Sequence, residues 1–183
     1  ERLNEQLLAD RLGVSRGPIR EAARLLERDG LVRSLANQGV FVRQLSLDDA
    51  VELYDLRAVI AGYACGWLAA RSTAEQRREL SGMVEEMDAA IEAVDEDAYF
   101  SLNLSFHDRI AELVGNGRTA NIYTGLGKEV RLLRRRVLHG VEAMRFSNDE
   151  HKAILAAIVA GDVASAREAA ERHHMNGKRR WLE

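Results

Sequence analysis

The chain has 183 residues, of which 46% are apolar and 30% are charged, a balance typical of a globular protein with an ordinary packed core. No apolar run approaches the roughly 20 residues needed to span a bilayer, which argues against a transmembrane protein. The single cysteine, Cys65, excludes a disulfide framework within the chain and favours a reducing cytoplasm. One proline and many Ala, Leu, Glu and Arg residues favour helix almost throughout.

The net charge is −3, but it is unevenly distributed along the chain. Between Arg11 and Arg43, seven arginines accompany only three acidic residues. Residues 44–183 carry 18 Lys and Arg against 23 Asp and Glu. A basic N-terminal segment followed by an acidic remainder is the charge distribution expected when only the N-terminal segment contacts the phosphates of a nucleic acid.

The first thirty residues predict two short helices joined by a tight turn. Residues 4–12 have helical periodicity and end at Gly13. Ser15 is a natural N-cap for the second helix. Pro18 is tolerated in its first turn because the amide that proline lacks has no helical partner there. Gly30 ends this second helix.

Two β-prone runs follow, residues 31–33 and 40–42, around Asn37-Gln38-Gly39, which is a hairpin-turn signal. Two helices and a hairpin describe a winged helix-turn-helix, whose second helix reads base edges with its N-terminal end. Arginine suits that position because its guanidinium can bind guanine or phosphate with two hydrogen bonds. Surface helices also carry many arginines, so spacing alone leaves open an ordinary amphipathic helix pair.

The stretch VSRGPIREAARLLERDGLV, with NEQLLADRLG before it and NQGVFV after it, resembles the GntR family of bacterial regulators. The resemblance implies that the main base and phosphate contacts come from two arginines, with backbone-proximal and wing contacts around them. The residues so implied are Ser15, Arg16, Gly17, Pro18, Arg20, Gln38 and Gly39. Gly17 replaces the commoner Thr, so one side-chain contact is absent. Members usually have another helix before Asn4, so we expect that the chain lacks its first residues.

The remainder of the chain predicts an all-helical domain. We place the boundary near Gln44–Ser46, with domains at residues 1–44 and 45–183. Capping patterns open three of the helices: Ser46-x-x-Asp49, Thr73-x-x-Gln76 and Ser147-x-x-Glu150. The expected spans are 46–70, 73–94, 96–114, 118–139, 147–161 and 162 to the C-terminus. The fold class is therefore mainly α: a winged helix-turn-helix followed by an antiparallel bundle of about six helices.

Three of the five histidines have a spacing that predicts convergence. Asn103 and His107 are four residues apart and share one helical face. We place His151 in the first turn of the fifth helix of this bundle and His173 in the sixth. Both lie about 15–18 Å from the intervening turn, so they come level if the helices fold back on each other. Three imidazoles and one oxygen suit zinc, with positions left for a ligand. Ordinary, partly buried histidines remain the alternative.

The motifs LYDLRAVI, NLSFH and NDEHKAILAAIVAGDVASAREAAERH resemble the FCD domain, found in the fatty-acid-regulator (FadR) branch of GntR proteins. The resemblance implies a divalent metal, with Zn²⁺ favoured and Ni²⁺ or Mn²⁺ as alternatives. The implied ligands are Asn103, His107, His151 and His173. Neutral Asn binds a cation more weakly than the commoner Asp. His174 stands where the pattern has an aliphatic residue, and we interpret it as a bystander.

FCD domains resemble sensors in which a small carboxylate sits on or beside the metal. A buried anion requires a cation close by. Arg57, in the LYDLR motif, is the first candidate, and the others are Arg131, Arg134 and Arg135. A solvent-exposed helix arginine is the alternative for each. Ala61 stands where the family often has Glu, so details of the pocket do not carry over.

The leading hypothesis is a transcription regulator of the bacterial cytoplasm, associated with the nucleoid, that binds a palindromic operator in double-stranded DNA as a homodimer. A small carboxylate would control its operator affinity. One alternative is a regulator that senses the metal alone. Another is a metal-dependent hydrolase, but the segments that supply the histidines contain no dedicated motif such as H-E-x-x-H.

Overall fold

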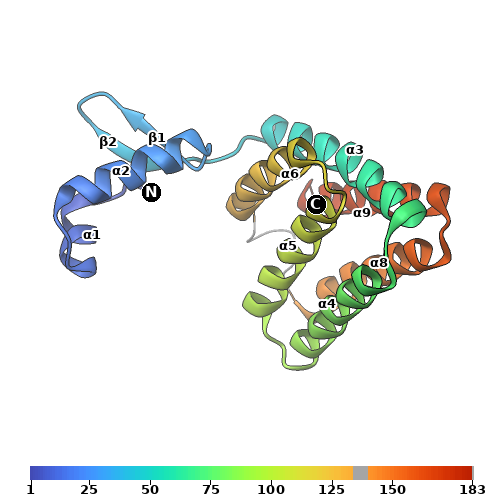
Figure 1. The fold of residues 1–183 in the computed structure, drawn as a ribbon. Coiled ribbons are helices and arrows are strands. Elements are labelled where there is room, and N and C mark those ends of the chain that lie inside the picture. Colours follow the sequence, from blue (N-terminus) through green and yellow to red (C-terminus); the bar gives the residue numbers. More distant parts are fainter. Residues whose placement is uncertain (134–139, 183) are drawn as a thin grey trace. The chain divides into compact units, whose positions relative to one another are not determined.

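The computed structural model describes residues 1–133 and 140–182 and separates the chain into two compact units, Glu1–Leu45 and Ser46–Glu183. Figure 1 shows the helices and strands of each unit. The mainly helical composition agrees with the prediction from sequence. Within the described ranges, no helix combines the length and the apolar character needed to cross a bilayer.

The first unit is a winged helix-turn-helix. It consists of α1 (Glu5–Leu12), α2 (Arg16–Arg28), β1 (Val32–Leu35) and β2 (Gly39–Val42). The carboxamide oxygen of Asn4 caps α1 by accepting a hydrogen bond from the amide of Leu7. Gly13 ends α1 with a φ of 66°, a left-handed conformation that favours glycine, and so allows the tight turn into α2.

The wing is the antiparallel hairpin of β1 and β2. Val32 pairs with Val42 at its base, and Leu35 pairs with Gly39 at its tip. Asn37 has a φ of 60° in the turn, which asparagine tolerates better than most residues. Inside the unit, Ala23, Val32 and Val40 form a small core against Leu3. This core fixes the wing against α2.

The second unit is a helical bundle, the FCD-like part of the sequence. Its elements are α3 (Leu47–Arg71), α4 (Ala74–Glu92), α5 (Glu96–Leu113), α6 (Gly117–Val130), the short 3-10 turn η1 (Arg131–Leu133), α8 (Val141–Ala160) and α9 (Val163–Leu182). Helix α9 packs along both α3 and α8, α4 packs on α5 and α8, and α5 packs on α6. The bundle therefore brings α5, α8 and α9, which carry the histidines, around one interior.

Local capping signals predicted two of the helix starts correctly. Ser46 and Asp49 form a reciprocal capping box at α3, and Thr73 and Gln76 form one at α4. Each box joins two residues three apart, so it forms without help from the rest of the fold.

The predicted start of a helix at Ser147 is wrong. Helix α8 begins two turns earlier, at Val141, after Gly140, whose amide donates a hydrogen bond to the Glu96 carboxylate over 2.9 Å. Ser147 is buried within the helix instead of capping it. His151 consequently lies in the middle of α8 and not in its first turn.

Helix α6 also differs from the prediction. Regular α-helix ends at Val130 and is followed by η1. The expected helix continued to His139, and its last part lies outside the described residues. Two of the candidate effector-binding residues, Arg134 and Arg135, belong to that part.

Candidate metal centre and DNA-binding surface

Three imidazoles converge inside the bundle. His107 comes from α5, His151 from α8 and His173 from α9, and all three are buried. Nε2 of His107 lies 3.0 Å from Nε2 of His173 and 3.2 Å from Nε2 of His151. The ligand atoms of the three residues lie within 4.8 Å of one another. The predicted convergence of these histidines is therefore present, and the triad could hold a metal ion.

In His151 and His173, a hydrogen-bond acceptor outside the triad determines which ring nitrogen carries the proton. Nδ1 of His173 donates to Oε2 of Glu150 over 2.7 Å. Nδ1 of His151 donates to Oδ1 of Asn148 over 3.3 Å. The amide nitrogen of Asn148 donates to the Asp88 carboxylate over 2.8 Å, which orients its oxygen toward the imidazole. Both rings therefore turn an Nε2 lone pair inward, the arrangement that metal-binding histidines need.

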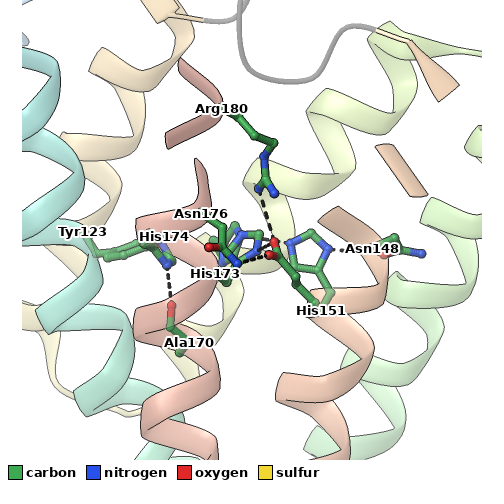
Figure 2. Close-up of polar contacts among 10 residues, drawn as sticks. Tyr123, Asn148, His151, Ala170, His173, His174, Asn176 and Arg180 are labelled. Atoms are coloured by element: carbon green, nitrogen blue, oxygen red, sulfur yellow. Dashed lines mark hydrogen bonds and ion pairs between the residues drawn. The ribbon is translucent and has the colours of Figure 1, made fainter. Parts of the chain in front are cut away.

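A cation would resolve a conflict at the centre of the triad. Nε2 of His107 faces the lone pairs of two other imidazoles, and at most one proton on that atom can satisfy one of them. In Figure 2, His173 lies between His174 and His151 in this view, and Arg180 points toward the cluster from above. An ion among the three nitrogens would accept all of the lone pairs at once.

The same burial keeps the histidines neutral. Loss of hydration lowers the pKa of His107 and of His151 well below the usual value, and His173 adds to this effect in both cases. Burial, together with the positive charges of Arg180 and Arg57, lowers the pKa of His173 to about 3. At neutral pH the imidazoles are thus in the form that binds metals.

Asn103 on α5 offers a further oxygen beside the triad. It is 8% exposed, and its Oδ1 has no hydrogen-bond partner in the part of the chain that the structure describes. Together with His107 and His173 it lines a cavity of about 40 Å³. A buried carbonyl oxygen without a partner is costly, and a cation would satisfy it. Three nitrogens and one oxygen fit a divalent metal ion.

Two arginines, the buried Arg57 and the half-buried Arg180, line the same cavity and have unused donors. Arg57 on α3 is 3% exposed, which excludes the alternative of a surface arginine. Its Nη2 donates to the Tyr123 hydroxyl over 2.8 Å, while Nη1 has no partner among the described residues. Arg180 on α9 donates from Nη2 to Glu150 over 3.2 Å. Its Nε and Nη1 also lack partners within residues 1–133 and 140–182. Such donors match a carboxylate.

The sequence reasoning missed Arg180 altogether. A usable signal existed, because Arg180 follows His173 by seven residues and so lies on the same face of a helix. Arg131, by contrast, is exposed in η1 and does not line the cavity. His174 is outside the converging triad, but it is buried and hydrogen-bonded to Tyr123 and Ala170.

A cleft in the first unit joins the start of α2 to the wing. Arg16, Arg20 and Gly39 line it, together with Arg2, which the sequence reasoning did not single out. Oε2 of Glu5 accepts from Nε of Arg20 over 3.0 Å and from Nη2 of Arg16 over 3.4 Å. The remaining predicted contacts are exposed and do not line this cleft; these are Ser15, Gly17, Pro18 and Gln38. The cleft therefore presents three guanidinium groups to an anionic partner.

Comparison with known proteins matches both units. The pattern described as bacterial regulatory proteins, gntR family, matches residues 1–42, and the FCD domain matches residues 52–176. The Nta operon transcriptional regulator of Aminobacter aminovorans is 30% identical over 151 residues, which are 82% of this chain and 70% of that protein. The gluconate operon transcriptional repressor of Bacillus licheniformis is 30% identical over 124 residues, covering 68% of this chain.

The chain spans about half the length of some of its relatives. The alignment covers 51% of the gluconate repressor and 55% of the HTH-type transcriptional regulator YdhC of Bacillus subtilis. The solved structure of Escherichia coli McbR/YncC has the same fold, with a TM-score of 0.86 at 20% identity over 96% of this chain and 84% of that one. These relatives are transcriptional regulators and not enzymes. The chain belongs to the GntR family of bacterial transcription regulators, with an FCD domain following its helix-turn-helix.

Proposed function

We propose that the protein is a metabolite-responsive regulator whose operator affinity is set by a small carboxylate bound at or beside a divalent metal. One observation carries the proposal. The cavity beside the histidine triad is lined by two of its members, by Asn103 with its unpartnered oxygen, and by two arginines with unused donors. A metal and an anion would satisfy these groups together, whereas either one alone would leave some of them unpaired.

His107, His151, His173 and Asn103 would hold the metal. A bound metal supplies a Lewis acid to which an oxygen of the ligand can bind. Zn²⁺ fits a nitrogen-rich donor set best, and Ni²⁺ or Mn²⁺ would bind the same residues with other preferences. Arg57 is the first candidate for binding the carboxylate, and we add Arg180, because both present free donors to the cavity.

DNA recognition is assigned to the exposed start of α2 and to the wing. Arg16 and Arg20 would contact bases and phosphates, assisted by Arg2. The backbone around the helix start and the wing tip would approach the duplex closely. The residues in these two places are Ser15, Gly17, Pro18, Gln38 and Gly39. The binding would take place in the bacterial cytoplasm, where operator DNA lies.

We propose that the active form is a homodimer bound to a palindromic operator. One recognition helix reads too few base pairs for genomic specificity, and two-fold symmetry doubles the site. Leu56, Val59 and Tyr63 are exposed along one face of α3, which supports this helix as the contact between two copies. Effector binding would then shift the equilibrium between states of different operator affinity.

A thermal-shift screen of the zinc-loaded protein against small carboxylates tests the effector. A ligand that binds the folded state stabilises it by about 2.7 kcal/mol when its concentration is a hundred times Kd. This stabilisation raises the melting temperature. We expect a hit with the wild type and none with Arg57→Ala. No response from any carboxylate at millimolar concentration would contradict a carboxylate effector.

Operator affinity, measured by fluorescence anisotropy, separates the two kinds of sensor. If zinc alone changes the affinity and carboxylates add nothing, the protein senses the metal. If the carboxylate found in the screen changes the affinity of the zinc-loaded protein, the proposal stands. Arg16→Ala and Arg20→Ala should weaken operator binding, whereas unchanged binding would contradict the assigned recognition helix.

A further inference from the structure

We infer that His174 and Tyr123 form a hydrogen-bond relay that holds Arg57 with its Nη1 free to bind an anion in the cavity. His174 is then a positioning residue that acts on Arg57 through Tyr123. The inference rests on the proposed function in one respect, namely that the cavity takes an anionic ligand.

The relay has a fixed direction. Nδ1 of His174 lies 2.9 Å from the carbonyl oxygen of Ala170, which can only accept, so this nitrogen carries the proton. Nε2 of the same ring is therefore an acceptor, and it lies 2.7 Å from the Tyr123 hydroxyl. The hydroxyl donates to it and accepts in turn from Nη2 of Arg57 over 2.8 Å. In the series of hydrogen bonds that runs from Arg57 through Tyr123 and His174 to Ala170, each donor thus has one acceptor.

The other tautomer of His174 would break this order. A proton on Nε2 would point at the Tyr123 oxygen, which already accepts from Arg57. The phenolic proton would then need a new acceptor, and the bare Nδ1 would face the carbonyl oxygen of Ala170. Tyr123 is 1% exposed and His174 is 3% exposed, so water cannot readily compensate for the mismatch.

Tyr123 restrains Arg57 in two ways at once. Besides the hydroxyl contact, the guanidinium carbon lies 4.2 Å from the centroid of the Tyr123 ring, within cation–π range. Two contacts to one residue fix both the plane of the guanidinium and its rotation. Nη1 is then left as the donor without a partner among the described residues, on a residue that lines the cavity.

The space beside Nη1 is kept open by a glycine. A Cβ atom at Gly127 would lie 3.2 Å from Nη1 of Arg57 and 3.2 Å from Oδ1 of Asp108. Neither of these two atoms has a hydrogen-bond partner within the described ranges. A side chain at position 127 would press on the group that the relay orients. The orientation of Arg57 is thus built before any ligand arrives, which reduces the entropy cost of binding.

Nitrogen-detected NMR of the zinc-loaded protein tests the relay without any effector. With ¹⁵N-labelled histidine, we expect the His174 ring to be protonated at Nδ1, and Tyr123→Phe to move its Nε2 resonance downfield. We also expect separate Nη proton signals for Arg57 in the wild type. They should average in Tyr123→Phe and in His174→Leu. Thr124→Val removes a hydroxyl from the same helix α6 that donates only to carbonyl oxygens of that helix, so it is the matched control and should change nothing.

Two results would overturn the relay: an Nε2-protonated His174, or Arg57 signals that are the same in the wild type and in Tyr123→Phe. Tyr123→Phe removes a single oxygen atom, so it keeps the test decisive if His174→Leu fails to fold.

Binding of malonate to the zinc-loaded protein gives the functional result. We expect Tyr123→Phe to weaken malonate binding about tenfold, which corresponds to ~1.4 kcal/mol, and Thr124→Val to leave it unchanged. Equal affinity in all variants would contradict the role in anion binding. Failure of malonate to bind the wild type would count against the proposed carboxylate effector, while the NMR signals would still decide the relay.

Discussion

His173 and Arg180 donate to the same oxygen atom, Oε2 of Glu150, over 2.7 and 3.2 Å. The imidazole would bind the metal, and the guanidinium lines the cavity proposed for the effector. One carboxylate therefore connects the two binding sites that we propose for the FCD domain. Asn176 donates to the other oxygen of Glu150 over 2.6 Å and so holds the carboxylate in place.

Glu150→Gln should weaken zinc binding by about 10- to 100-fold. The carboxylate fixes the tautomer and raises the basicity of His173, and loss of such a partner costs a metal site that much affinity. Competition with a chromophoric chelator measures the change. Asp149→Asn, which removes the same charge from an exposed neighbour, is the control. Equal affinities for the two variants would show that Glu150 does not support the site.

Asn103→Asp should strengthen zinc binding, because an anionic oxygen replaces a neutral one in the donor set. Asn103→Ala should weaken it. The same chelator competition applies, with Asn121→Asp on the exposed side of α6 as a control for the added charge. If Asn103→Asp and Asn121→Asp have the same affinity as the wild type, Asn103 is not a ligand.

The metal-free protein should lose stability as the pH falls below about 6.5. The buried histidines have a pKa below the usual value of 6.5 in the folded state, and burial is the largest cause. The unfolded chain therefore binds more protons in acid than the folded chain does. Stability is full above pH 6.5 and is lost as the pH falls toward 3, where His173 becomes protonated.

Each histidine that stays neutral contributes a slope of up to about 1.4 kcal/mol per pH unit in that window. Urea midpoints of the chelator-treated protein between pH 7.5 and 5.0 measure the effect before most carboxylates titrate. A constant midpoint over this range would contradict the assignment of neutral histidines.

Glu5→Gln should increase the affinity for duplex DNA of random sequence at low salt. Hydrogen bonds from Arg20 and then from Arg16 lower the pKa of Glu5, so its carboxylate is charged and competes with phosphate for both arginines. Fluorescence anisotropy measures the affinity. Glu21→Gln is matched in charge but pairs with Arg24, and we expect a smaller gain from it. Equal gains would mean that only net charge matters.

Cys65 should not react with a thiol reagent in the folded protein at pH 8. The residue is 1% exposed, and burial raises the pKa of its thiol to about 12, so the reactive thiolate is scarce. Addition of urea should release one thiol per chain. Fast labelling without denaturant would indicate that the contact between α3 and its neighbours opens readily.

Sequence reasoning succeeded where the signal is local or repeats along one helix. The capping boxes at Ser46 and Thr73 join residues three apart, and Asn103 and His107 share a face because of the helical period. The same capping pattern at Ser147 failed because Glu150 makes tertiary contacts, to His173, Asn176 and Arg180. A sequence pattern cannot distinguish a cap from such a side chain.

The burial of Arg57 also could not be predicted from the sequence. Most of α3 is apolar on several faces, and the side of the helix that α9 covers depends on the packing of the whole bundle. Whether an arginine on such a helix faces solvent or a cavity is therefore a tertiary property. The same holds for His174, whose role depends on Tyr123, 51 residues away in the chain.

The short turn at Gly161 has a consequence for the order of folding. Gly161 adopts a left-handed φ of 73° between α8 and α9, so the two helices form a hairpin of neighbouring segments. Contacts within such a hairpin close small loops and form early, whereas α5 must join from much farther along the chain. His151 and His173 can thus assemble as a pair before His107 arrives. A metal ion captured by the pair would then recruit α5 and speed the closure of the bundle.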